Sequence, residues 1–321
     1  MKKNLFQNPF FAAGDGADFF DGFVPGSAIW ALQSDPFSFA AAGDISAAKS
    51  GGGSKPGGGG GGGGGGGTVW QPYISGTEAD DSTEFNIALN FSGSGWTQSL
   101  YDTVKASADL ISSIITGDIT DVAYNGQIYD DLTINFSIGR IDGAGRGLLG
   151  NVLAQTSDIV VRDEGDVANF GVLPNELYLP VEASIRIDSY DAQNFSAGTW
   201  DAIILHEMVH ALGFVGAIFD LKSLVSGDFF IGADATAAYG GAVPLETGGG
   251  SGTAGSHWSE TAFAPDGEAT PNDLMTGYIG SGESTVLSDT TVGALADLGY
   301  TVIDPTPDSP SETIDYLLTW L

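Results

Sequence analysis

The sequence His206-Glu207-Met208-Val209-His210 restricts the fold of this chain more than any other stretch. Residues four apart lie on one face of an α-helix, so the imidazoles of His206 and His210 can bind one metal ion together. Glu207 lies beside them, close enough to act on a water molecule at that ion. Such an H-E-x-x-H helix is typical of zinc sites in which two imidazoles hold the metal and a carboxylate takes a proton from water.

The flanking residues favour a helix at this position. Thr199 can cap its N-terminus, and Asp201 then lies in the first turn, where the helix dipole favours a negative charge. Gly213 follows the motif as a C′ residue that can turn left-handed and end the helix. The motif is therefore expected on a helix whose two histidines face the segment that comes next.

Two imidazoles and a water would hold zinc poorly, so a third protein ligand is required. The chain has three histidines in all, and the one outside the motif is His257. A carboxylate is the alternative, from Glu246, Glu260 or Glu268. These three lie in sequence rich in Gly and Pro and lack the helical E-x-x-x-D context of the thermolysin-like class, so the residues favour His257.

Four segments carry a resemblance to a known family, namely His206–Phe214, His257-Trp258, Asn272–Gly277 and Leu287–Tyr300. Together they resemble the leishmanolysin family of metzincin zinc endopeptidases. The likeness covers about residues 83–303 and is strongest from residue 199 onward. Many metzincins carry the third histidine six residues after the second, where this chain has Gly216. Leishmanolysin-like enzymes have an insertion before it, which fits the position of His257.

The resemblance implies a function and a set of roles. The protein would be an endopeptidase that hydrolyses peptide bonds, with Zn²⁺ bound by His206, His210 and His257. Glu207 would be the general base that activates a zinc-bound water, and Met275 would be the Met-turn residue beneath the metal. The alternative for Met275, without the resemblance, is that it simply fills the hydrophobic core, as a lone Met usually does.

The resemblance also implies an α+β, metzincin-like fold with two lobes. The N-terminal lobe would hold a mixed sheet and two long helices, the second of which carries H-E-x-x-H. The C-terminal lobe would be irregular, with the Met-turn and a C-terminal helix. The expected division of the chain is a targeting or pro-segment at 1–50, a Gly-rich linker at 51–67, a catalytic domain at 68–303 with lobes of about 68–214 and 215–303, and a tail at 304–321.

Hydrophobic periodicity predicts the α+β elements directly. Apolar residues recur at helical spacing over 100–115, which predicts a long packing helix. Strands are predicted at 85–91, 132–138, 149–154 and 183–188. This order of strands and helices is typical of an α+β lobe.

The chain after Gly213 is expected to be irregular, with a long Gly-rich surface insertion at 242–256. A last helix is predicted from a cap at Ser288 through Leu298, with Gly299 as its C′ residue. Leu295 and Leu298 should face inward.

Composition bounds the partners and the location. The chain has 41 acidic and 10 basic residues and a net charge of −31, which disfavours nucleic acid and anionic membranes. No apolar run is long enough to predict a transmembrane helix. Met1-Lys2-Lys3 is not followed by the continuous apolar stretch of a cleaved Sec signal. We expect a secreted, monomeric protein, with a cytoplasmic location as the alternative.

Latency by a cysteine switch is excluded because the chain has no cysteine. A carboxylate at Asp15 or Asp44 could instead cover the zinc, as in the aspartate switch of the astacin metzincins, although the residues favour an unrelated export or disordered segment. Gly14–Asp18 is one imperfect copy of a calcium-binding turn, so Ca²⁺ has no clear motif here.

The substrate is expected to be a protein or peptide bound in extended form along an exposed strand edge. The predicted edge is the segment Ser184, Ile185, Arg186, Ile187 and Asp188. An alternative function from another class is an inactive metzincin-like module for binding or adhesion, in which zinc is structural. Structural zinc usually has four protein ligands and gives Glu207 no role.

Overall fold

The computed structural model describes residues 69–76, 83–124, 126–141, 152–193, 197–248, 253–263, 272–277 and 285–303. Several expectations therefore lie outside the described residues. They are the N-terminal segment with Asp15 and Asp44, the Gly-rich linker, the alternative ligand Glu268 and the tail at 304–321.

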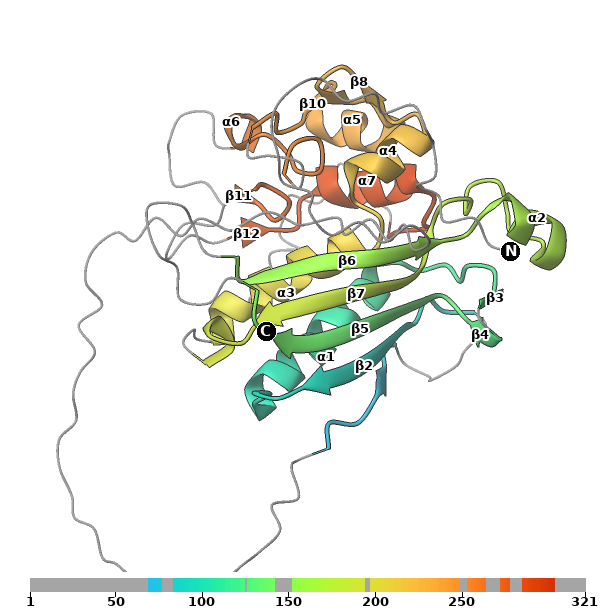
Figure 1. Ribbon diagram of the computed structural model, residues 1–321. Helices are drawn as coiled ribbons and strands as arrows, with labels where there is room; N and C mark the ends of the chain where they lie inside the picture. Colours follow the sequence, from blue (N-terminus) through green and yellow to red (C-terminus); the bar gives the residue numbers. More distant parts are fainter. Residues whose placement is uncertain are drawn as a thin grey trace, which may run out of the picture.

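A mixed five-stranded sheet forms one half of the α+β structure (Figure 1). Its order is β1-β2-β5-β7-β6, where β1 is Tyr73–Ile74, β2 is Ile87–Gly93, β5 is Leu132–Gly139, β7 is Pro180–Asp188 and β6 is Ala154–Val161. The three central strands β2, β5 and β7 are parallel to one another. The edge strands β1 and β6 run antiparallel to their neighbours.

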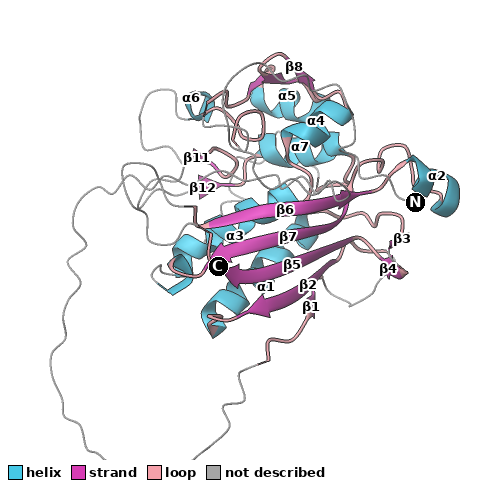
Figure 2. Cartoon of the chain, in the orientation of Figure 1, coloured by secondary structure: helices cyan, strands magenta, loops and turns pink. Residues whose placement is uncertain are grey.

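Two long helices lie behind the sheet in the view of Figure 2, where helices and strands have separate colours. They are α1, Gln98–Ile114, and α3, Ala197–Ala211. The side chain of Thr97 accepts a hydrogen bond from the Leu100 amide and caps α1. The predicted apolar stripe of α1 is buried, including Val104 and Ala108, so this helix is confirmed. Helix α3 carries the H-E-x-x-H motif and begins at Ala197, so Thr199 is not its cap.

Three of the four predicted strands are confirmed to within two or three residues at their ends, as β2, β5 and β7. Of the strand predicted at 149–154, residues 149–151 lie outside the described residues and 152–153 are not in a strand; β6 begins at Ala154 and runs on to Val161. The sequence of β6 does not show a regular alternation of apolar and polar residues, for two reasons. Thr156 takes a buried position, and the register shifts between Ser157 and Val160, where Asp158 has a φ of 53°.

The expected exposed edge at Ser184–Asp188 is also wrong. This segment belongs to β7, which pairs with β5 on one side and with β6 on the other. Its main-chain groups are therefore used within the sheet, and an added peptide strand has no place beside it. Among the described residues, the edge strand on this side of the sheet is β6.

Residues after Gly213 are more ordered than expected. They form α4 at Gly216–Leu221, α5 at Ala233–Tyr239, α6 at Glu260–Phe263, α7 at Asp289–Leu298, a three-stranded sheet of β8 at Val225–Ser226, β9 at Phe229–Phe230 and β10 at Val243–Pro244, and a parallel pair of β11 at Asn272–Asp273 and β12 at Thr285–Val286. The predicted surface insertion is confirmed only in part, since Ala242, Thr247, Gly248 and Ala254 are exposed but other residues of the segment are buried. Val243, Leu245 and Thr253 are buried. Such short elements are held by their neighbours and leave little periodicity in the sequence.

Helix α7 matches its prediction. The Ser288 side chain accepts a hydrogen bond from the Thr291 amide, Gly299 ends the helix with a φ of 116°, and Leu295 and Leu298 are buried. The helix crosses α5 at close range. A Cβ atom at Gly293 would lie 2.8 Å from the Ala235 nitrogen, so this crossing requires glycine.

The remaining elements lie at the two ends of the sheet, with a hairpin and a helix at one end and a 3₁₀ turn after β7 at the other (Figure 1). They are the hairpin of β3 at Val122–Tyr124 and β4 at Gln127–Tyr129, the capped helix α2 at Glu164–Phe170, and a 3₁₀ turn at Asp191–Gln193. Buried Asp131 lies between the hairpin and β5, where its carboxylate accepts hydrogen bonds from the Asn86 and Ile119 amides at 2.6 and 2.9 Å. Burial raises the pKa of Asp131 to about 8.

Candidate metal centre

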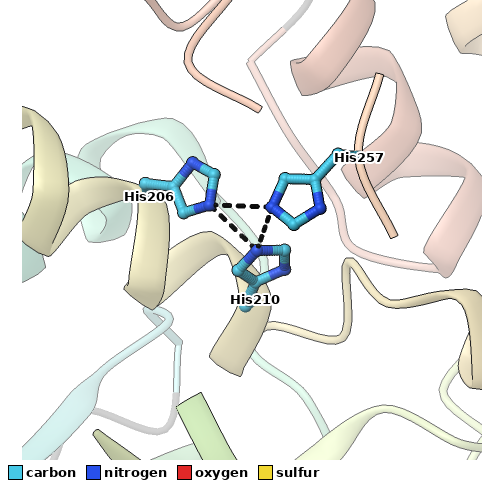
Figure 3. Close-up of side chains that lie close together, drawn as sticks. All are labelled: His206, His210 and His257. Carbon is cyan, nitrogen blue, oxygen red and sulfur yellow. Dashed lines mark hydrogen bonds between the residues drawn. The ribbon is translucent and has the colours of Figure 1, made fainter. Parts of the chain in front are cut away.

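The side chains of His206, His210 and His257 converge on one point (Figure 3). Their Nε2 atoms are 3.0 Å apart between His206 and His210, and 3.1 Å from each of these to His257. Helix α3 supplies the first two ligands, and the loop before α6 supplies the third. All three side chains are at most 2% exposed.

The hydrogen bonds of the other ring nitrogens define the tautomer of each histidine. A main-chain carbonyl can only accept, so an Nδ1 atom bonded to one must carry the proton, which leaves a lone pair on Nε2. Such carbonyls are present for all three rings, from Leu274 at 2.7 Å for His206, Phe214 at 2.7 Å for His210 and Thr253 at 3.2 Å for His257.

Three Nε2 lone pairs thus face one another across about 3 Å inside the protein. Without a cation between them this arrangement is repulsive, and with one it is a complete set of donors. Three nitrogens bound at about 2.0–2.1 Å to a tetrahedral zinc lie about 3.3 Å apart, so the rings need to separate by only a few tenths of an ångström. The residues fit a metal ion, although imidazole nitrogens also suit copper, iron and nickel.

The electrostatics of the site keep the ligands neutral. Burial, with a smaller contribution from a neighbouring histidine, lowers the pKa of His210 and of His257 to about 3. The same two causes lower the pKa of His206 well below its ordinary value. Neutral imidazole is the form that binds metal, so the protein holds these side chains ready for an ion across the physiological pH range.

Gly213 shapes the end of α3 as predicted, with a φ of 99°. The left-handed turn at this glycine brings the Phe214 carbonyl back to His210. The chain then enters α4 at Gly216, the residue six positions after His210. Its amide donates to the Ser256 hydroxyl at 3.0 Å, directly beside His257 in the sequence. This hydrogen bond from Gly216 therefore stabilises the loop that carries His257.

Glu207 is fully buried next to the first ligand. The Thr156 hydroxyl lies 2.7 Å from its Oε2 atom and 2.9 Å from its main-chain oxygen. Because Thr156 is on β6, the Glu207 side chain lies between α3 and this edge strand of the sheet. Thr156 was not predicted from the sequence. It is a polar residue at a buried position of β6, and the irregular register of this strand hides its periodicity.

Met275 is buried in a segment that contacts two of the ligand-bearing regions. The preceding Leu274 carbonyl is the partner of His206, and the Met275 carbonyl accepts from the Trp258 amide at 2.9 Å. The predicted Met-turn segment is thus brought to the histidines. That Met275 acts as a Met-turn residue beneath a metal stays a prediction.

The carboxylate alternatives for the third ligand are not brought to the site where they are described. Glu246 uses its Oε1 atom to accept from the Thr247 and Gly248 amides at 2.9 and 2.7 Å, in its own loop. Glu260 lies in the first turn of α6. Within the described part of the chain, the metal-binding group at this point consists of the three histidines.

A second group of possible ligands is formed by Asp118, Asp130 and Asp131. Both carboxylate oxygens of Asp131 are already bonded to main-chain amides. Acidic side chains often lie this close without an ion, so the group gives no support for Ca²⁺.

One described segment, Trp200–Leu221, is long and apolar enough to cross a membrane by length and composition. In the fold, 83% of its most apolar stretch is buried inside the protein. The segment contains the ligands His206 and His210, and its burial is that of a core helix.

Comparison of the sequence with known protein families finds no matching family model, and comparison with characterised proteins finds no match. The resemblance to leishmanolysin-like enzymes therefore stays a prediction from the motifs. The geometry of the three histidines and Glu207 stands independently of it.

Proposed function

We propose that this protein is a zinc-dependent endopeptidase with a metzincin-like, two-lobed fold. The observation that carries the proposal is the convergence of three Nε2 lone pairs beside the buried carboxylate of Glu207. The mixed sheet backed by α1 and α3, with a buried Met275 segment against the histidines, supports the same assignment.

The number of protein ligands favours catalysis over a structural role. Structural zinc sites are usually closed by four protein ligands, whereas catalytic sites have three and keep a position for water or substrate. The described residues offer three histidines at this point, and the chain has no cysteine. A bound zinc would supply Lewis-acid chemistry, polarising a peptide carbonyl and making water a stronger nucleophile at neutral pH.

Glu207 is the residue of the chain that moves the proton. Its carboxylate follows the first ligand on α3 and takes a proton from the attacking water, then returns it to the amine that leaves. The Thr156 hydroxyl, 2.7 Å from Oε2, holds the side chain against β6 while this occurs. The imidazoles would not compete for the proton, since their Nε2 lone pairs would be bound to the metal and burial lowers the pKa of each ring.

The position of β6 suggests how substrate binds. This strand is the edge of the sheet among the described residues, and its residue Thr156 contacts Glu207. An exposed strand edge offers unpaired main-chain groups to an extended peptide. We therefore infer that the substrate strand lies beside β6, because β7 is an interior strand.

Hydrogen exchange can test this placement. Adding a saturating, non-cleavable peptide analogue to the zinc-loaded protein should slow exchange of β6 amides that do not face β7, because the peptide would accept from them. Amides of β7 should change little, since they are already bonded within the sheet. Protection confined to other elements would show that the peptide binds elsewhere.

Removal of the metal tests the function itself. A strong chelator should abolish hydrolysis of an unfolded protein such as casein, because the reaction depends on the ion bound by His206, His210 and His257. One equivalent of zinc should then restore the activity. Mock-treated protein dialysed in parallel is the control. Tight zinc binding without hydrolysis of any peptide pool would instead support the binding or adhesion module.

A further inference from the structure

Asp273 is a buried carboxylate that accepts hydrogen bonds from its own segment and from the start of α7. It accepts from the Met275 amide at 2.6 Å and from the Thr291 hydroxyl at 2.8 Å. It also accepts from the amide and the hydroxyl of Ser288. Ser288 and Thr291 belong to the start of α7, so this one side chain ties the Met275 segment to that helix.

The same residues connect to two of the three histidines. The residue after Asp273 is Leu274, whose carbonyl accepts from His206. On the other side, the Thr291 hydroxyl accepts from the Trp258 indole at 2.8 Å, and Trp258 is the neighbour of His257 in the chain. Asp273 is thus the chain neighbour of Leu274, whose carbonyl orients His206. Through the Thr291 hydroxyl it is also connected to Trp258, the chain neighbour of His257.

A purely structural role is the plain alternative, since a carboxylate at a helix N-terminus stabilises the helix. That role explains the contacts with Ser288 and Thr291. It does not explain why the Thr291 hydroxyl is shared with Trp258. The bond from the Met275 amide is a local Asx turn, and it also fixes the Leu274 peptide whose carbonyl orients the first ligand. Both of these additional contacts lead to ligand-bearing segments.

We propose that Asp273 is a positioning residue for the metal centre, which holds the Leu274 carbonyl and Trp258 so that His206 and His257 direct their Nε2 atoms at one ion. This inference rests on the proposed function only in requiring that the three histidines bind a divalent metal. It assigns no contact between Asp273 and metal or substrate.

The test compares zinc affinity and cobalt spectra of purified variants. Asp273→Asn keeps the shape of the side chain but turns an amide NH₂ toward hydrogen-bond donors. We expect its zinc dissociation constant to rise about 10- to 100-fold, the usual effect of losing an outer partner of a metal ligand. The visible absorption of the cobalt-loaded variant should also change, because the ligand geometry changes.

A second pair of variants covers the case in which Asp273→Asn does not fold. Thr291→Val removes the hydroxyl that joins Asp273 to Trp258 and keeps the side-chain shape, while Thr291→Ser keeps the hydroxyl. We expect about a 10-fold weaker zinc affinity for the valine variant. The serine variant should be close to wild type in affinity and in the cobalt spectrum.

Asp131→Asn is the matched control. Asp131 is also a buried carboxylate that accepts from main-chain amides, and its partners Asn86 and Ile119 lie outside the segments that carry the three histidines. It should lower the melting temperature of the metal-free protein and leave the zinc affinity and cobalt spectrum unchanged.

The outcomes separate this inference from the proposed function. Wild-type affinity and spectrum in both Asp273→Asn and Thr291→Val would overturn the positioning role and leave the metal site standing. An affinity loss in Asp131→Asn as large as in Asp273→Asn, at equal loss of melting temperature, would also overturn it. A wild-type protein that binds no zinc would overturn the proposed function and this role with it.

Discussion

His257→Ala should lose most of its zinc and all measurable peptide hydrolysis. The His257 Nε2 atom lies 3.1 Å from those of His206 and His210. Its Nδ1–H group donates a hydrogen bond to the Thr253 carbonyl. Zinc binding by four protein ligands is worth roughly 10–16 kcal/mol, so one ligand contributes about 3 kcal/mol, or about a 100-fold change in affinity. Zinc content after dialysis and titration with a competing chelator measure the loss.

Glu246→Ala is the matched control for His257→Ala. Glu246 was an alternative ligand in the sequence, and its carboxylate binds its own loop in the structure. This variant should keep a full equivalent of zinc and most of the activity. If His257→Ala retained one equivalent of zinc at wild-type affinity, the three-histidine site would be wrong and a carboxylate ligand would have to be sought.

Glu207→Ala should also lose its activity, but unlike His257→Ala it should retain its zinc. The carboxylate is beside the ligands without being one of the three convergent donors. Loss of a general base costs about 100- to 10,000-fold in rate. Glu207→Gln is the sharper variant, because an amide of the same shape can still accept from Thr156 and cannot take a proton.

The measurements for Glu207 are zinc content and kcat/KM on the same preparations. Equal zinc content with a large fall in kcat/KM in both variants separates proton transfer from metal binding. Glu207→Gln with more than a tenth of wild-type activity would mean that another group is the base. A parallel loss of zinc would mean that Glu207 supports the ligands and not the chemistry.

Local patterns in the sequence were sufficient for part of this structure. The periodicity of Val104 and Ala108 predicted α1, the clean alternation of β5 predicted that strand, and Gly213 was identified as the residue that ends α3. The two histidines of the motif lie on one helix, so their meeting required no knowledge of the tertiary fold. Each of these features depends on residues within a few turns of one another.

Features that depend on distant pairing were missed. Whether β7 is an edge strand is decided by β6, and the irregular register near Asp158 conceals β6 in the sequence. The short elements between Gly216 and Leu245 are held by contacts with other segments. Thr156 and Asp273 act through bonds to residues 51 and 18 positions away, which no local spacing reveals.

The separation of the ligands along the chain has a consequence for the free energy of the whole fold. His210 and His257 are 47 positions apart, and the chain between them contains α4, α5 and the small β8–β10 sheet. An ion held by both residues closes this segment into a ring, as a disulfide does in other proteins, and reduces the conformational freedom of the opened chain. In a protein without cysteine, the metal would be the cross-link of the C-terminal half, visible as slower amide exchange in α4 and α5 once zinc is added.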